Sequence, residues 1–164
     1  MDEAITRYLR VEHALAIGSQ TAEAIKIAIG SAVALQPEET TEVRGRHLIT
    51  GLPTQIQLRS EEVREAIRGP LREIVDAIKD TLEQTSPELT GDISRDGILL
   101  AGGGTLLRGF PELVAAETGV PVFLATSPLT CVVTGSGQAL DHFDQLSRSG
   151  RSGRAGRWRG GARG

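Results

Sequence analysis

Hydrophobic and polar positions over the first 30 residues predict two helices. Ile5, Tyr8 and Leu9 follow the spacing of a helical face, with Arg10 and Glu12 on the polar side, and Gly18 is expected to end this first helix. A second helix is expected to begin at Thr21, whose side chain is a suitable N-cap, and to stop at Gly30. The chain therefore opens with a helical pair.

Residues 36–60 have a different pattern, in which apolar and polar side chains alternate. This alternation is typical of half-exposed strands and occurs over residues 40–45 and again over residues 55–58. Gly51, Leu52 and Pro53 separate the two runs and favour a turn. We therefore predict a small β-meander after the two helices.

A long amphipathic pattern begins at Ser60, which is expected to cap a helix. Gly69 and Pro70 interrupt this pattern, and proline removes a helical N–H and crowds the preceding turn. We therefore expect the helix to break or kink there and take this point as a lobe boundary. The expected apolar stripe consists of Val63, Ile67, Leu71, Ile74, Ile78 and Leu82.

The segment 70–146 predicts an α/β layer, because short apolar runs alternate with helical patterns. Two strands alone do not form a stable open sheet, so this half-sheet is expected to need a partner. Gly135 and Gly137 lie in the last predicted helix and indicate close helix packing. The expected order is a connection over 87–92, a strand over 98–101, a helix over 111–117, a strand over 120–124 and a helix from Pro128 to about Leu146.

Charge divides the chain into an acidic body and a basic tail. Residues 1–146 carry 12 basic and 21 acidic side chains, so a surface for duplex nucleic acid is not expected there. Residues 147–164 carry six arginines and no acid, lack hydrophobic periodicity and are predicted to be disordered. Such a tail could bind RNA, with Trp158 available for stacking, or be a remnant of cloning or a frameshift.

Composition otherwise fits a soluble globular protein, with 39% hydrophobic and 24% charged residues. No apolar run approaches the roughly 20 residues that span a bilayer, and the first residues lack the apolar block of a secretory signal. The single cysteine, Cys131, excludes an internal disulfide, suits a reducing cytoplasm and is expected to be a small buried residue. The three histidines have no ligand spacing, so no metal site is predicted.

The run 97–105 contains the strongest local motif, an apolar strand that ends on three consecutive glycines. Glycines at such a junction let the backbone bend sharply and bring N–H groups close to a ligand. Many such junctions are only tight turns. A dinucleotide-binding enzyme is disfavoured, because the G-x-G-x-x-G spacing and the acidic ribose ligand are missing.

Residues 1–146 closely resemble the MreB family of bacterial actin-like proteins, which govern rod shape. The resemblance is carried, in order, by TAEAIKIAIGSA, VRGRHLITGLP, SPELTGDI and GILLAGGGTLLRGFPELV. It implies an α/β chain with a partial actin/Hsp70-type ATPase fold, of which only the second half is present. Residues 1–69 would form a small α+β lobe like subdomain IIB, and residues 70–146 most of subdomain IIA. The basic tail departs from the family.

The resemblance also implies two groups of site residues that face the adenosine of ATP. Glu23 would accept hydrogen bonds from the ribose and Lys26 would flank the adenine, although by spacing alone they could be an ordinary solvated pair. The glycines would form a backbone wall. No residue is assigned a catalytic or metal-binding role. The implied site residues are Glu23, Ala24, Ile25 and Lys26 on a helix, and Gly102, Gly103, Gly104 and Thr105 in the glycine segment.

The intact family binds ATP with Mg²⁺, but its two glycine-rich phosphate-binding hairpins have no counterpart in this sequence. We therefore expect a truncated form that binds ATP weakly or not at all and is not an ATPase on its own. The family implies self-association into filaments, shape-complex partners such as RodZ, organisation of cell-wall synthesis, and a cytoplasmic, membrane-associated location. Membrane contact is expected only through the missing half. The alternative is a non-nucleotide interaction module that binds such filaments or their partners.

Overall fold

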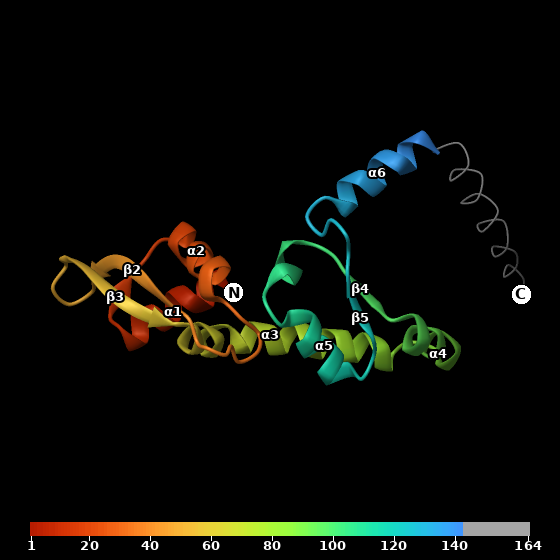
Figure 1. Ribbon diagram of the computed structural model, residues 1–164, viewed down its shortest axis with the longest axis horizontal. Coiled ribbons are helices and arrows are strands. Elements are labelled where there is room, and N and C mark those ends of the chain that lie inside the picture. The colour runs from red at the N-terminus through yellow and green to blue at the C-terminus, as the bar shows by residue number, and fades with distance from the viewer. Residues whose placement is uncertain (143–164) are drawn as a thin grey trace, which may run out of the picture.

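The computed structural model of the protein describes residues 1–142 and shows an elongated molecule (Figure 1). Helix α3 (Ser60–Glu83) runs along its length and contributes to both ends. A group of helices and a sheet lies at one end of α3, and a second, smaller sheet lies toward the other. The tail 147–164, for which the sequence predicts disorder, lies outside the described residues, as does the predicted end of the last helix.

The N-terminal lobe is built from five elements that pack against the first half of α3. Its sheet is antiparallel with the order β1-β2-β3, and Val43 pairs with Ile56 in the predicted meander. The five elements are α1 (Asp2–Glu12), β1 (Leu15–Ala16), α2 (Ser19–Ile29), β2 (Thr40–His47) and β3 (Pro53–Arg59).

Two predicted boundaries in this lobe are wrong. The first helix ends at Glu12 rather than Gly18, because the chain turns there and Leu15–Ala16 becomes the third strand of the sheet. The second helix begins at Ser19 with Gly18 as its N-cap, one turn earlier than a Thr21 cap would allow. Both errors come from treating glycine and threonine as boundary signals without the tertiary contacts that decide where pairing starts.

The core of the N-terminal lobe draws buried side chains from each surrounding element. Its largest members are less than 2% exposed, so the lobe removes its apolar stripes from water almost completely. This burial, rather than helix propensity, supplies most of the stability of the short helices. The fully buried aliphatic residues are Ile5 and Leu9 from α1, Leu15 from β1, Ala22 from α2, Val43 from β2, Leu58 from β3, and Val63 and Ile67 from α3.

Helix α3 continues through Pro70, so of the predicted break or kink the break is wrong. Ile67 and Leu71 flank the proline and are at most 3% exposed, and their packing holds the helix together across the missing hydrogen bond. Ser60 is the first helical residue rather than the cap. Arg59 occupies the N-cap position, where its backbone N–H donates to the Glu62 carboxylate at 2.9 Å.

The second half of α3 supports a two-stranded parallel sheet in which Leu99 pairs with Phe123. Residues 87–92, expected as a connection, instead begin helix α4, which starts with proline in its first turn. Leu100 and Val114 are buried in one hydrophobic cluster with Leu71 and Val75 of α3. The elements are α4 (Pro87–Asp96), β4 (Ile98–Leu100), the 3₁₀ helix η1 (Gly103–Leu106), α5 (Phe110–Thr118), β5 (Val122–Leu124) and α6 (Cys131–Asp141).

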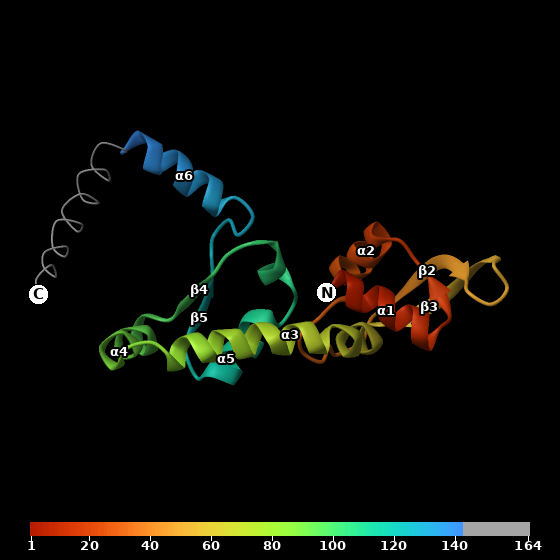
Figure 2. The same ribbon diagram turned by 180° about the vertical axis from the view of Figure 1, so that it is seen from behind.

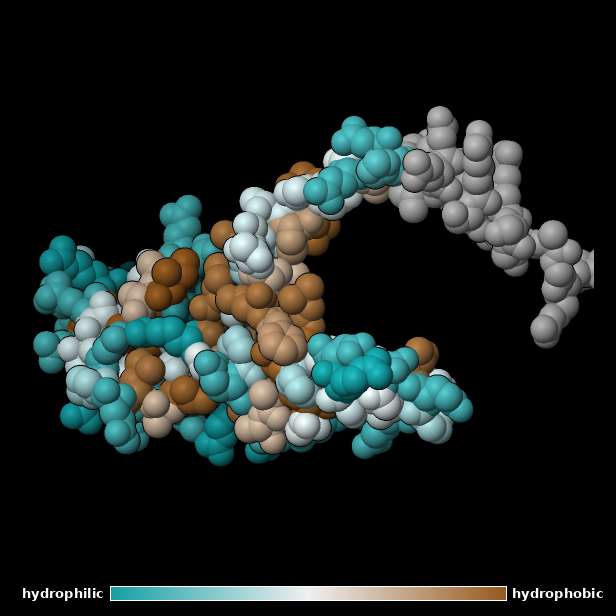
Figure 3. Space-filling model, turned by 45° about the vertical axis from the view of Figure 1, so that its right-hand side comes forward, coloured by the Kyte–Doolittle hydropathy of each residue, from teal (hydrophilic) through white to brown (hydrophobic). Residues whose placement is uncertain are grey.

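Helix α6 stands away from the rest of the molecule in both ribbon views (Figures 1 and 2). A Cβ added at Gly135 or Gly137 would meet open space, so the predicted close helix packing is wrong for the described chain. Cys131 is half-buried rather than buried. Figure 3 shows apolar side chains gathered where the arm that carries α6 meets the body. Leu99 and Phe123 on the sheet and Leu129, Val132 and Val133 near α6 are all more than half exposed.

Candidate functional site

A cleft of about 550 Å³ opens between helix α2 and the 3₁₀ helix η1. It brings together two segments about 80 positions apart in the sequence, the polar face of α2 and the glycine run. The volume lies within the range of ligand-binding clefts. The lining residues are Met1, Glu23, Lys26, Ile27, Gly30, Gly103, Gly104, Leu106, Leu107 and Leu129.

The α2 wall presents one carboxylate and one ammonium group. Lys26 Nζ lies 2.8 Å from Asp2 Oδ1, an ion pair that fixes the ammonium beside the start of α1. Glu23 is exposed and, within residues 1–142, makes no ion pair. Its carboxylate can therefore accept hydrogen bonds from hydroxyl groups of a ligand without losing an internal partner.

Ala24 and Ile25, the other two residues that the resemblance placed on this wall, do not line the cleft. Ile25 is 4% exposed and belongs to the core of the N-terminal lobe. Both residues instead line a separate shallow hollow against β2. The cause is helical geometry, since positions 23 and 26 share one face and positions 24 and 25 point to other sides.

The opposite wall combines the backbone of Gly103 and Gly104 with leucine side chains, and Gly102 lies beside it without lining the cleft. Gly102 has φ +96°, a conformation that side chains other than glycine rarely adopt, and its N–H donates to the Pro128 carbonyl at 2.8 Å. Gly103 and Gly104 begin η1, so their N–H groups have no acceptor within that helix. Thr105 is buried, and its hydroxyl donates to the Gly102 carbonyl at 2.7 Å. Thr105 therefore shapes the glycine turn rather than lining the cleft.

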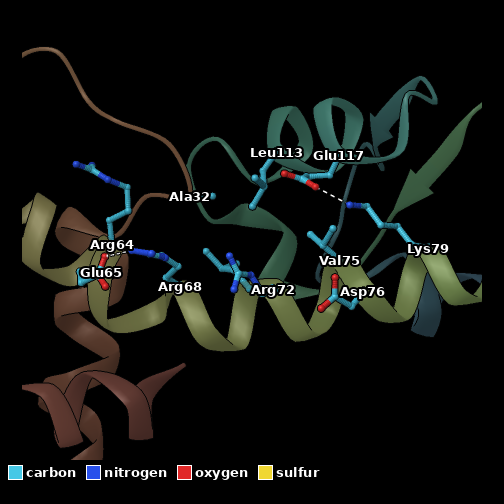
Figure 4. Close-up of a pocket in the computed structure, with 11 residues that line it drawn as sticks. Ala32, Arg64, Glu65, Arg68, Arg72, Val75, Asp76, Lys79, Leu113 and Glu117 are labelled. Carbon is cyan, nitrogen blue, oxygen red and sulfur yellow. Dashed lines mark hydrogen bonds and ion pairs between the residues drawn. The ribbon is translucent and has the colours of Figure 1, made fainter.

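A second hollow of about 520 Å³ lies between α3 and α5 (Figure 4). Arg64, Arg68 and Arg72 recur every fourth residue along α3, a spacing visible in the sequence that the prediction did not use. Lys79 Nζ lies 2.6 Å from Glu117 Oε2, and this hydrogen bond lowers the pKa of the Glu117 carboxyl. Most cations here have an internal carboxylate partner, so this hollow is a weaker ligand site than the α2–η1 cleft.

Other classes of site are not found among residues 1–142. No group of three or more His, Cys, Asp and Glu side chains in that range could hold a metal ion. None of the helices that the structure describes is long and apolar enough to cross a membrane. The α2–η1 cleft is therefore the candidate functional site.

Comparison with solved structures defines the class of protein. The chain matches the crystal structure of MreB5 of Spiroplasma citri bound to AMPPNP with a TM-score of 0.84 and 35% sequence identity. The match covers 91% of this chain and 45% of that one. The predicted partial actin-like α/β fold is thus confirmed.

Sequence comparison identifies the family. The family described as MreB/Mbl protein matches residues 1–148, and the chain belongs to this family. It is 48% identical over 143 residues to the cell shape-determining protein MreB of Escherichia coli, covering 87% of this chain and 41% of that protein. It is 42% identical over 147 residues to the cell shape-determining protein Mbl of Bacillus subtilis, covering 90% of this chain and 44% of that protein. The chain thus spans less than half the length of these relatives.

Proposed function

We propose that this chain supplies one side of the nucleotide site of an MreB-type filament protein, with the adenosine of ATP in the α2–η1 cleft. The observation that carries the proposal is the meeting of Glu23 and Lys26 with Gly103 and Gly104 across one cleft. The relative MreB5 of Spiroplasma citri was solved with AMPPNP bound, which supports a nucleotide as the ligand.

The residues of the cleft fit a nucleoside. Glu23 accepts hydrogen bonds from the ribose hydroxyls, and Lys26, held by Asp2, lies beside the base. Because Gly103 and Gly104 lack side chains, the ligand can approach their backbone closely. Apolar surface from Ile27 and Leu106, both at least half exposed, is available to the base.

The same residues do not fit Mg²⁺. This ion prefers octahedral oxygen coordination, and Glu23 is the only carboxylate among the residues that line the cleft. We therefore infer that Mg²⁺ and the phosphates are held by polypeptide outside this chain. The chain alone then binds ATP weakly, and it contributes positioning of the adenosine rather than a hydrolytic group.

A chimaera tests the nucleotide site. Residues 1–142 would replace the matching segment of E. coli MreB, and binding of a fluorescent ATP analogue would be titrated with and without substitutions. Glu23→Ala and Lys26→Ala should each weaken binding about tenfold, the loss expected for one charge-assisted contact. Arg44→Ala, which removes an exposed arginine outside the cleft, should leave binding unchanged. Equal affinity of all four proteins would overturn the proposal.

We also propose the family's larger role for the whole protein. Residues 1–69 act as a IIB-like lobe and residues 70–146 as a IIA-like lobe. The protein self-associates into cytoplasmic filaments that organise cell-wall synthesis with partners such as RodZ, and it contacts the membrane through polypeptide outside this chain. Membership in the MreB/Mbl family supports this role. Electron microscopy of the chimaera with ATP should reveal filaments, and their absence under conditions in which E. coli MreB polymerises would contradict it.

The second candidate function is an interaction module that does not depend on nucleotide. The exposed apolar side chains of Leu99 and Phe123 on the sheet and of Val132 on α6 favour it, because exposed apolar side chains that gather together mark contact surfaces. Purified chain added in excess to polymerising E. coli MreB should then change light scattering without any nucleotide bound to the chain. No change would argue against this function.

A further inference from the structure

The floor of the α2–η1 cleft is a seam between two segments, residues 30–33 after α2 and residues 107–109 after η1. Gly30 and Leu107 both line the cleft, so the seam lies directly beneath the candidate ligand position. Ser31 and Arg108 form an isolated parallel bridge across it. The two cleft walls are thus joined below the ligand, at positions 77 residues apart in the sequence.

The guanidinium of Arg108 makes three contacts across the seam. Nη2 donates to the Ala28 carbonyl at 2.7 Å, and Nε donates to the Gly30 carbonyl at 3.3 Å. Nη1 pairs with Glu39 Oε1 at 2.8 Å. The last carbonyls of a helix have no intrahelical donor and attract cations, so Arg108 completes the C-terminal end of α2. One side chain from the glycine segment therefore holds the helix that carries Glu23 and Lys26.

Backbone contacts reinforce the same seam. The Ala32 N–H donates to the Arg108 carbonyl at 2.7 Å. Ser31 is fully buried, and its hydroxyl lies within hydrogen-bonding distance of the carbonyls of Val33 and Arg108. Gly109 has φ +72°, and a Cβ there would collide with the Val33 side chain, so the two segments lie against each other without space for adjustment.

We propose that Arg108 is a positioning residue that holds the α2 wall and the glycine wall of the cleft at a fixed separation. The inference rests on the proposed function for the identity of the ligand. The contacts by which Arg108 joins the two segments, called the clasp below, do not depend on that identity. Arginine suits this position because its planar guanidinium group donates to several acceptors in fixed directions at once, whereas the ammonium group of lysine is a compact point charge. Substituting Arg108 should loosen both walls together.

Hydrogen exchange on the 164-residue chain tests the clasp. Arg108→Ala should raise exchange about tenfold in residues 28–33 and also in residues 103–109, the loss expected for a charge-assisted contact. Amides of α1 should not change more than in the matched control Arg44→Ala, whose side chain is 78% exposed and bonds outside the seam. Arg108→Lys should show the same two-segment pattern to a smaller extent, because it keeps the charge near Glu39 but loses the fork.

Three results would overturn the proposal that Arg108 joins the two segments. They are no change in Arg108→Ala, a change in only one of the two segments, and a uniform change that includes α1. If Arg108→Ala does not fold, Arg108→Lys and Glu39→Gln decide the question, since each leaves part of the seam intact. Glu39→Gln should loosen the same two segments less than Arg108→Lys.

The role of the clasp in ligand positioning is measured separately in the chimaera. Arg108→Ala should weaken binding of the fluorescent ATP analogue about tenfold, and Arg44→Ala should not. Unchanged affinity in Arg108→Ala would overturn positioning even if exchange shows a loosened seam. If the chimaera without substitutions binds no nucleotide, the proposed function fails and the positioning role fails with it, whereas the exchange experiment still decides whether Arg108 joins the two segments.

Discussion

The N-terminal lobe and the C-terminal sheet of this chain bury their apolar residues to very different extents. In the lobe, Ile5, Leu9 and Ile67 are at most 1% exposed. On the uncovered face of the two-stranded sheet, Leu99 is 68% exposed and Phe123 is 54% exposed. Both regions have well-formed secondary structure. The comparison shows that local pattern can specify a strand or helix whose stabilising contacts lie on polypeptide elsewhere.

The difference has an energetic consequence for the whole chain. Burial of one large aliphatic or aromatic side chain contributes roughly 1.5–3 kcal/mol, and the sheet face and α6 forgo several such contributions. The lobe should therefore carry most of the folding stability. The uncovered face should drive association, since a second polypeptide could bury it.

The largest expected effect is a difference in the free energy of unfolding between a core substitution in the N-terminal lobe and a surface substitution in α6. Ile67→Ala removes a fully buried side chain and should lower the free energy of unfolding by about 2–5 kcal/mol. Leu140→Ala removes a side chain that is 73% exposed and should change the free energy of unfolding by less than about 0.5 kcal/mol. Urea denaturation measures both, and similar losses would contradict the comparison.

The uncovered sheet face gives the next effect. Leu99→Ser combined with Phe123→Ser makes this face more polar and should weaken self-association of the chain about tenfold. Sedimentation velocity over a concentration series measures the change. Ile49→Ser, which alters an 85% exposed residue in the N-terminal lobe, is the matched control. If the double variant associates as strongly as the control, the face is not the contact surface.

Pro70 lies in α3 between the two regions and offers a smaller effect. The proline interrupts the hydrogen-bond ladder of a helix that nevertheless continues. Pro70→Ala should therefore raise the free energy of unfolding, by about 1 kcal/mol once the greater freedom of the unfolded chain is included. Thermal and urea unfolding measure it. A loss of stability would mean that the ring of Pro70 makes packing contacts that outweigh the missing bond.

The smallest effect is a pH dependence at the contact between α3 and α5. The hydrogen bond from Lys79 lowers the pKa of Glu117 below its ordinary value of 4.5. A carboxyl whose pKa is lower when folded contributes stability above its unfolded pKa, and that contribution disappears as pH falls through the folded pKa. Stability should therefore decline below about pH 4.5 in the native chain and decline less in Glu117→Gln.

Urea midpoints between pH 3 and pH 7 measure this dependence. Glu88→Gln is the matched control, because Glu88 is an exposed residue that makes no ion pair within residues 1–142. A pH profile of Glu117→Gln identical to that of the native chain would show that the Lys79–Glu117 pair does not contribute to folding.

Much of the fold could be predicted from the sequence, because apolar spacing marks most of its elements. The meander, the strand before the glycines and the helix after Phe110 all follow from this spacing. Helix α4 was missed because it buries no residue completely and its apolar side is only one pair, Leu89 and Ile93, too short to be recognised as a helical pattern. The Ser86-Pro87 pair at its start was the available signal. Pro70 caused the opposite error, because it predicted a helix end within α3. The packing around Pro70 outweighs the free-energy cost of a proline inside the helix.

The candidate site could be predicted only in part. The family resemblance selected Glu23, Lys26, Gly103 and Gly104, which line one cleft, but also Gly102, which does not. Spacing alone could not show that they face each other, since long-range contacts decide this. The same limit hid Arg108, because two of its three acceptors are backbone carbonyls about 80 positions away, which leave no residue pattern.

Calorimetric titration of ATP with Mg²⁺ into the 164-residue chain and into the chimaera tests the central claim most directly. The account predicts little or no heat of binding for the chain alone, because the cleft holds only the adenosine. It predicts measurable binding by the chimaera, reduced by Lys26→Ala. Submicromolar affinity of the chain alone would contradict the account, because the α2–η1 cleft would then suffice without any polypeptide outside this chain.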